Sequence, residues 1–218
     1  INTPVASIKS NNGIVAKLLT SIEDTELKEM LTDINEIDKE AVSRISSIVT
    51  SLKKFVRLDE AELQEADINK ELDLTLELIR HETKNRIEVI KNYGEIPVIK
   101  CFPNMLNQVF TNILINACQA IEGNGKITIT TEYNDKKLIV KIKDTGRGIP
   151  RNQLNKIFTA GFTTKSSGVG TGLGLAICSK IIEKHNGEII VNSEVGKGSE
   201  FIITTVSYTH LRAHETLS

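Results

Sequence analysis

A long run of apolar residues spaced alternately three and four positions apart is the feature of this 218-residue chain that most constrains its fold. The run lies between Thr25 and about Arg57, and the spacing places all its members on one face of a helix. A narrow apolar seam with charged residues on the other faces is typical of a coiled coil or helical bundle. The seam consists of Leu27, Leu31, Ile34, Ile37, Ala41, Ile45, Ile48, Leu52 and Phe55.

A shorter amphipathic segment from Pro4 to Thr20 precedes this run, and Ser21 to Asp24 would form the turn between two helices. We therefore expect residues 1–64 to form a helical hairpin. Because so narrow a seam cannot bury itself within one hairpin, we also expect two copies to pair as a homodimer with a four-helix bundle.

Beyond a polar stretch at Asp59 to Glu65, helix-like segments alternate with short strand-like segments. These mixed elements predict an α+β fold for residues 65–206, a sandwich with helices on one face of a sheet and the other face exposed. Asn134-Asp135 would form a hairpin turn. Residues 207–218 have no core-directed periodicity and are expected to be a disordered or non-native tail. The expected helices are Asn69–His81, Asn104–Ile121 and Gly172–His185, and the expected strands are Arg86–Lys91, Lys126–Glu132, Lys137–Lys143, Glu188–Asn192 and Glu200–Thr205.

The charge and cysteine content exclude several classes of protein. A formal net charge of -1 argues against a broad nucleic-acid surface. Cys101, Cys118 and Cys178 lie far apart, which indicates reduced core residues rather than a disulfide or metal framework. No apolar run is long enough to cross a bilayer and no signal-peptide pattern begins the chain. We therefore expect a cytoplasmic location, with membrane attachment only through segments upstream of this chain.

Two asparagines one helical turn apart are the first candidate binding residues. Asn112 and Asn116 flank the apolar run Ile113-Leu114-Ile115, so their surroundings differ from those of an ordinary solvated helix face. A neutral amide oxygen is a hard ligand suited to Mg²⁺ that already carries phosphate oxygens. The alternative is a pair of surface asparagines, although asparagine is a poor helix former.

An aspartate–glycine turn follows the expected strand Lys137–Lys143. Asp144 begins the segment DTGRGIP, in which Gly146 and Gly148 would let the backbone approach a flat ligand closely. The carboxylate of Asp144 could then accept a hydrogen bond, for example from an adenine amino group. A plain Asp-Gly turn is the alternative interpretation.

A second glycine-rich segment, Gly168 to Leu175, opens a helix with an apolar face. Glycines before a helix free backbone N–H groups to point at phosphate, and the helix dipole favours the anion. The spacing is neither GxGxxG nor GxxxxGKS/T, which excludes the Rossmann and P-loop interpretations. Phe158 to Lys165 is rich in small residues and ends in a lysine, as a mobile lid over phosphates would.

The order of these motifs resembles that of the catalytic ATP-binding domain of histidine kinases, in the superfamily shared with type II topoisomerases, the Hsp90 chaperone and MutL. NILINA resembles the family's N box, DTGRGI its first glycine box, IFTAGFTTK its phenylalanine box, GTGLGLAI its second glycine box and GKGSEF its final glycine motif. The resemblance covers about Asp67 to Val206 and implies ATP and Mg²⁺ as ligands.

The resemblance also implies roles for individual residues. Asn116 would hold Mg²⁺ with support from Asn112, and Asp144 would bind adenine. Gln119 departs from the family, in which many members have a basic residue there, so phosphate contacts would rest more on Lys165. The remaining nucleotide-binding residues would be Gly146, Gly148, Ile149, Thr164, Gly170, Thr171, Gly172, Leu173 and Gly174.

Asn112 distinguishes between branches of the superfamily. The hydrolysing members place a glutamate at the matching position, and asparagine cannot act as a general base. This favours phosphoryl transfer to a protein side chain through positioning and Mg²⁺ charge neutralisation. Such a kinase would phosphorylate a bundle histidine and pass the group to a response-regulator aspartate, under the control of an upstream sensor module. A hydrolysing ATPase and a non-catalytic dimerisation module are the alternatives.

The first residues, INTPV, resemble the back half of the family's H box. The resemblance implies that the phosphoacceptor histidine precedes Ile1 and is absent here, that Thr3 is the phosphatase-associated residue, and that Pro4 bends the helix. The segment His81 to Asn85 also fits HExxN but lacks the proline. We interpret His81, like His185, as a helix C-terminal histidine favoured by the helix dipole.

Overall fold

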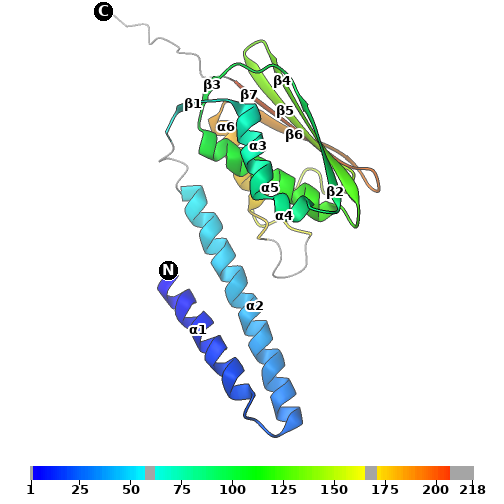
Figure 1. Cartoon of the computed structure of the whole chain (residues 1–218). Helices are drawn as coiled ribbons and strands as arrows, with labels where there is room; N and C mark the ends of the chain where they lie inside the picture. The colour runs from blue at the N-terminus through cyan, green and yellow to red at the C-terminus, as the bar shows by residue number, and fades with distance from the viewer. Residues whose placement is uncertain (1, 57–61, 165–170, 207–218) are drawn as a thin grey trace, which may run out of the picture. The chain divides into compact units, whose positions relative to one another are not determined.

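The computed structural model describes residues 2–56, 62–164 and 171–206, so Lys165, Gly170 and the predicted tail at 207–218 lie outside the described residues. The chain divides into two compact units, which are described separately. One unit contains a helical hairpin and the other contains a sandwich within Leu58–Ala160 and Gly174–Ser218 (Figure 1). In the described part of the chain, no helix combines the length and the apolar character that a membrane span requires.

The predicted hairpin is confirmed and consists of α1 (Asn2–Leu19) and α2 (Thr25–Val56). The hydroxyls of Thr20 and Ser21 donate to the carbonyls of Lys17 and Leu18 at 2.6 and 2.7 Å, where α1 ends. Asp24 then caps α2, because its Oδ1 accepts the N–H of Leu27 at 3.0 Å.

The two helices of the hairpin do not pack through the predicted apolar seam. Asn35 and Val42 are buried on α2, and each lies one position beyond a member of that seam. Four seam residues are instead between 43% and 66% exposed, namely Leu27, Ile34, Ile37 and Ile45. One helical position corresponds to a large rotation about the helix axis, so the hairpin uses a neighbouring stripe and leaves these four seam residues uncovered. Asn12 and Leu19 are the buried residues described on α1.

The second unit is built on a five-stranded sheet with the order β2-β4-β5-β7-β6. β2 runs parallel to β4, and every other neighbouring pair is antiparallel. A second sheet of two short strands pairs β1 (Gln64–Ala66) with β3 (Ile99–Cys101), and neither strand was predicted. The strands of the main sheet are β2 (Ile87–Tyr93), β4 (Gly125–Asn134), β5 (Lys137–Asp144), β6 (Glu188–Glu194) and β7 (Gly198–Val206).

The helices of this unit cover one face of the main sheet (Figure 1). They are α3 (Ile68–Leu78), α4 (Arg80–Thr83), α5 (Pro103–Ala120) and α6 (Gly174–Lys184). Alternate residues of β4, such as Ile127 and Ile129, are fully buried beneath them, and so is Phe110 of α5. Burying a side chain of this size stabilises a fold by about 1.5–3 kcal/mol. The predicted α+β sandwich is therefore confirmed.

The turn between β4 and β5 differs in detail from the prediction. Asp135 and Lys136, rather than Asn134-Asp135, occupy the two central positions, with φ angles of 50° and 63°. Two successive positive φ values are characteristic of a type I′ turn, whose twist matches that of the flanking strands.

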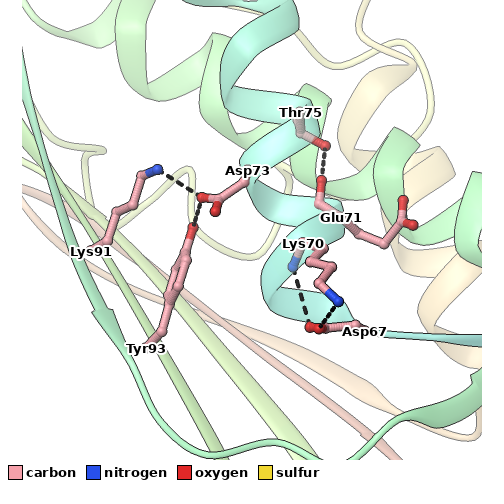
Figure 2. Close-up of polar contacts among 7 residues, drawn as sticks. All are labelled: Asp67, Lys70, Glu71, Asp73, Thr75, Lys91 and Tyr93. Carbon is pink, nitrogen blue, oxygen red and sulfur yellow. Dashed lines mark hydrogen bonds and ion pairs between the residues drawn. The ribbon is translucent and has the colours of Figure 1, made fainter.

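Polar contacts attach α3 to β2 (Figure 2). The carboxylate of Asp67 caps α3 by accepting the N–H groups of Asn69 and Lys70 at 3.1 and 3.3 Å. Farther along the helix, Asp73 accepts hydrogen bonds from Lys91 Nζ at 2.7 Å and from the Tyr93 hydroxyl at 3.0 Å. These contacts fix the start and the exposed side of α3 against the edge of the sandwich.

Candidate functional site

The asparagine-bearing face of α5 lies against α6. Asn112 donates from Nδ2 to the carbonyl of Gly174 at 3.2 Å, and the same nitrogen lies 3.6 Å from Sγ of Cys178. Asn116, one turn farther along α5, is half-buried like Asn112. The predicted location of these residues on one helix is confirmed, and the described contacts add α6 as the support of Asn112.

Asp144 is the last residue of β5, and its side chain is only 2% exposed. Its Oδ1 accepts the N–H of Gly146 at 2.7 Å and the N–H of Ser199 at 3.3 Å. Burial raises the pKa of this carboxyl group, although the two backbone hydrogen bonds act in the opposite direction. The site therefore contains a desolvated carboxylate held in one orientation by backbone donors.

The glycines after Asp144, which are predicted to let the backbone approach a ligand closely, also have a packing role. A Cβ atom at Gly146 would lie 2.6 Å from the carbonyl oxygen of Ala120. A Cβ atom at Gly148 would lie 2.1 Å from the carbonyl oxygen of Glu194, at a φ of +72°. These two glycines are required by the close approach of α5 and the β6–β7 turn.

Hydrogen bonds fix the turn that follows Asp144 to α5 and to β6. The N–H of Arg147 donates to the carbonyl of Ala120 at 2.9 Å, and the N–H of Ile149 donates to Ser193 Oγ at 2.8 Å. Ser193 and Ser199 were not predicted as site residues. Ser199 lies in the GKGSEF motif, which was a signal for it, whereas nothing in the sequence around Ser193 indicated its contact with Ile149.

The segment Gly161–Leu173 does not belong to the sandwich unit and is described by itself. Gly161 donates its N–H to the carbonyl of Gly172 at 3.0 Å. Gly172 has a φ of +66°, and a Cβ atom there would overlap the backbone of Gly161. The predicted residues Thr164, Thr171, Gly172 and Leu173 lie in this segment, and the N–H of Leu173 donates to Thr171 Oγ1 at 3.4 Å.

Seven of the predicted site residues lie in the sandwich unit: Asn112, Asn116, Asp144, Gly146, Gly148, Ile149 and Gly174. Thr3 lies in α1, in the other unit. His81 is an exposed residue of α4, paired with Glu82 at 3.5 Å. This unit contains a buried carboxylate at a strand end, an amide-bearing helix and the start of a second helix. The combination defines an α/β-sandwich domain of the nucleotide-binding class.

Comparisons with known proteins identify the family within that class. The family model for the histidine kinase-, DNA gyrase B-, and HSP90-like ATPase matches residues 102–209. The sensor histidine kinase ZraS of Escherichia coli (strain K12) is 36% identical over 167 residues, which cover 76% of this chain and 35% of ZraS. The chain therefore spans about a third of the length of the curated relatives it matches.

Solved structures support the same assignment. The catalytic domain of the histidine kinase ThkA is 33% identical, with a TM-score of 0.61, over 67% of this chain and 96% of that domain. Full-length ShkA in complex with AMPPNP has a TM-score of 0.68 and 26% identity, over 96% of this chain and 46% of ShkA. ThkA in complex with the response regulator TrrA has a TM-score of 0.68 and 25% identity, over 94% of this chain and 59% of that chain. The chain belongs to the histidine kinase family.

Proposed function

We propose that this chain binds Mg²⁺-ATP and that its full-length protein transfers the γ-phosphoryl group to a histidine of the helical bundle, for passage to a response-regulator aspartate. The observation that carries this proposal is the neutral amide of Asn112, held against α6 by the Gly174 carbonyl at 3.2 Å. An amide at this position can orient a bound ligand but cannot take a proton from water, so transfer is favoured over hydrolysis.

Asp144 would bind the adenine ring. Its two described hydrogen bonds both use Oδ1, so Oδ2 is the atom for an adenine amino group. A buried carboxylate recognises such a donor strongly, because charge-assisted hydrogen bonds gain strength where water is excluded. Gly146, Gly148 and Ile149 would hold this carboxylate in place through their contacts with the rest of the domain.

The metal and phosphates would lie at the α5 and α6 end of the site. Asn116, supported by Asn112, offers the hard amide oxygens that suit Mg²⁺ on phosphate. The first turn of α6 begins at Gly174, and its N–H groups and dipole favour an anion. The glycine-rich segment would complete the phosphate contacts through Thr164, Lys165, Gly170, Thr171, Gly172 and Leu173. When bound, Mg²⁺-ATP supplies the phosphoryl group, and the metal neutralises its charge.

The helical hairpin would form the homodimer and carry the regulator interaction. Its exposed apolar seam, which includes Ile34 and Ile37, is the surface for a second copy. The ThkA–TrrA complex supports a response-regulator receiver domain as the partner. Thr3 would serve a phosphatase reaction. An upstream sensor module would control the kinase. The kinase would act in the cytoplasm, because it depends on the ATP pool.

Titration of AMPPNP into the chain, with and without Mg²⁺, tests the site. Asp144→Asn should weaken Mg²⁺-AMPPNP binding by about 10- to 100-fold, since a hydrogen bond to a charged group contributes about 1.5–3 kcal/mol. Asn116→Ala, which removes the proposed metal ligand, should reduce the Mg²⁺-dependent part of the affinity. Asn104→Ala is the matched control, because Asn104 is exposed on the same helix. No binding by the wild-type chain, or equal binding by all variants, would contradict the proposal.

Incubation with radiolabelled ATP tests the reaction. The proposal predicts bound nucleotide without steady phosphate release, because Asn112 provides no general base. Steady release in the absence of an acceptor protein would favour a hydrolysing ATPase instead. Labelling of the chain that is lost on His81→Ala would show that His81 is the acceptor, contrary to our interpretation of it as a helix-terminal residue.

A further inference from the structure

Cys178 is a buried thiol with two polar neighbours on α5. Its side chain is fully buried in α6, and its Sγ lies 3.6 Å from Nδ2 of Asn112. The same sulfur lies 4.0 Å from the carbonyl oxygen of Val109, which is within reach of a weak S–H donor. Burial raises the pKa of this thiol to about 12, so it remains a neutral group that can donate and accept at the same time.

The amide of Asn112 is constrained from three directions. Nδ2 donates to the Gly174 carbonyl and to Cys178 Sγ. Gly174 also covers the amide, because a Cβ atom at that glycine would lie 3.7, 3.8 and 3.9 Å from Cγ, Nδ2 and Oδ1 of Asn112. Among the described residues, both hydrogen bonds of this side chain are donated by its nitrogen.

We propose that Cys178 is a positioning residue, which together with the Gly174 carbonyl turns the amide nitrogen of Asn112 toward α6 and presents Oδ1 to the Mg²⁺-bearing phosphates. The two ends of a carboxamide have nearly the same size, so only its hydrogen-bond partners select the orientation. A flipped amide would present an NH₂ group, which cannot act as a ligand for a cation. The identity of the ligand rests on the proposed function, whereas the orientation rests on the contacts of α6.

Substitution of Cys178 tests this role. Cys178→Val keeps a compact apolar side chain but removes the sulfur acceptor and the weak donor. We expect AMPPNP affinity without Mg²⁺ to stay within about twofold, while the Mg²⁺-dependent increase in affinity falls by about three- to tenfold, the size expected for one weak hydrogen bond. Cys178→Ser, whose hydroxyl can replace both contacts, should restore that increase. If the valine variant fails to fold, Cys178→Ala removes the same contacts without added bulk.

Cys118→Val is the matched control. Cys118 is also fully buried, but it lies in the last turn of α5, where the guanidinium of Arg86 donates to its carbonyl at 2.9 Å. The control should bind AMPPNP with the wild-type Mg²⁺ dependence and should unfold at a temperature similar to that of Cys178→Val. A full Mg²⁺ effect in Cys178→Val, or an equal loss in Cys118→Val, would overturn the proposal.

The side-chain amide resonances of ¹⁵N-asparagine-labelled protein give an independent readout. In the wild type and in Cys178→Ser, the NH₂ group of Asn112 should be protected from exchange with water, and that protection should decrease in Cys178→Val. An unprotected NH₂ group in the wild-type chain would overturn the proposed orientation. Failure of the wild-type chain to bind AMPPNP would instead refute the proposed function, while the amide protection would still decide the orientation.

Discussion

Two glycines with the same φ angle allow the stability costs of backbone conformation and of side-chain packing to be measured separately. Gly123 and Gly148 both have a φ of +72°, but a Cβ atom at Gly123 would meet nothing within 4 Å, whereas one at Gly148 would lie 2.1 Å from the carbonyl oxygen of Glu194. Gly123→Ala should therefore cost only the left-handed conformation, about 1–2 kcal/mol. Gly148→Ala should have the same conformational cost and, in addition, an overpacking cost of about 1–3 kcal/mol.

Chemical denaturation of the two variants measures both costs. The free energy of unfolding should fall further in Gly148→Ala, and AMPPNP affinity should fall with it, because the displaced turn follows Asp144 directly and holds its carboxylate through the N–H of Gly146. Gly123→Ala should retain nucleotide binding. Equal destabilisation of the two variants would show that the approach of Glu194 is relieved by a small backbone shift.

At the level of single residues, the sequence predicted the positions of the residues that belong to a motif. It did not predict which other residues hold them in place. The positions of Asn112, Asn116 and Asp144 in the fold followed from the helix and strand patterns around them. Ser199 acts through its backbone N–H, which every residue but proline possesses, and Cys178 acts through a contact between two helices. Neither contact produces a periodicity that a single sequence can reveal.

At the level of elements, His185 links the last turn of α6 to the start of α5. We expected a helix C-terminal histidine favoured by the helix dipole, and the structure adds that this side chain is buried and makes contacts through both ring nitrogens. The Nε2 of His185 accepts the N–H of Phe102 at 3.1 Å, and its Nδ1 lies 2.8 Å from the carbonyl oxygen of Ile181, which assigns a neutral ring that donates from Nδ1. Burial lowers the pKa of His185 below its ordinary value of 6.5.

This contact predicts that acid destabilises the domain. Between the lowered pKa of folded His185 and 6.5, the unfolded state binds a proton that the folded state does not, so the free energy of unfolding falls as the pH decreases. His185→Gln should be less stable at neutral pH but should lack this part of the pH dependence. His81→Gln, at a histidine whose side chain is 75% exposed, is the matched control and should keep the wild-type slope. Identical slopes in all three proteins would contradict the assignment.

Long elements were predictable because their apolar residues repeat often enough to reveal a period. All five strands of the main sheet and the helices α5 and α6 were predicted to within a few residues. The strands β1 and β3 have only 3 residues each, too few for an alternating pattern. In α2 the pattern identified an apolar face, but not which stripe α1 covers, since that choice depends on the geometry of the turn.

At the level of the whole molecule, the described side chains of the hairpin form a poor interface between α1 and α2. Among the hairpin side chains that the structure describes, two of the four buried ones are asparagines, and Nδ2 of Asn12 and Oδ1 of Asn35 have no hydrogen-bond partner. An unsatisfied buried polar group costs about 1–3 kcal/mol, and four described seam residues that could offset this cost, Leu27, Ile34, Ile37 and Ile45, are exposed. A second copy on that seam would supply the missing burial and complete a four-helix bundle.

Sedimentation equilibrium tests this requirement. The chain should be a dimer, and Ile37→Glu should raise its dissociation constant at least about 100-fold, since each of two symmetry-related side chains loses about 1.5–3 kcal/mol of apolar burial. Leu78→Glu is the matched control, because Leu78 of α3 is 74% exposed and Ile37 is 66% exposed, and only Ile37 belongs to the seam. The control should remain a dimer, and both variants should bind AMPPNP, because neither Ile37 nor Leu78 is among the proposed nucleotide contacts. A monomeric wild-type chain, or equal dissociation of the two variants, would show that the seam is not the dimer interface.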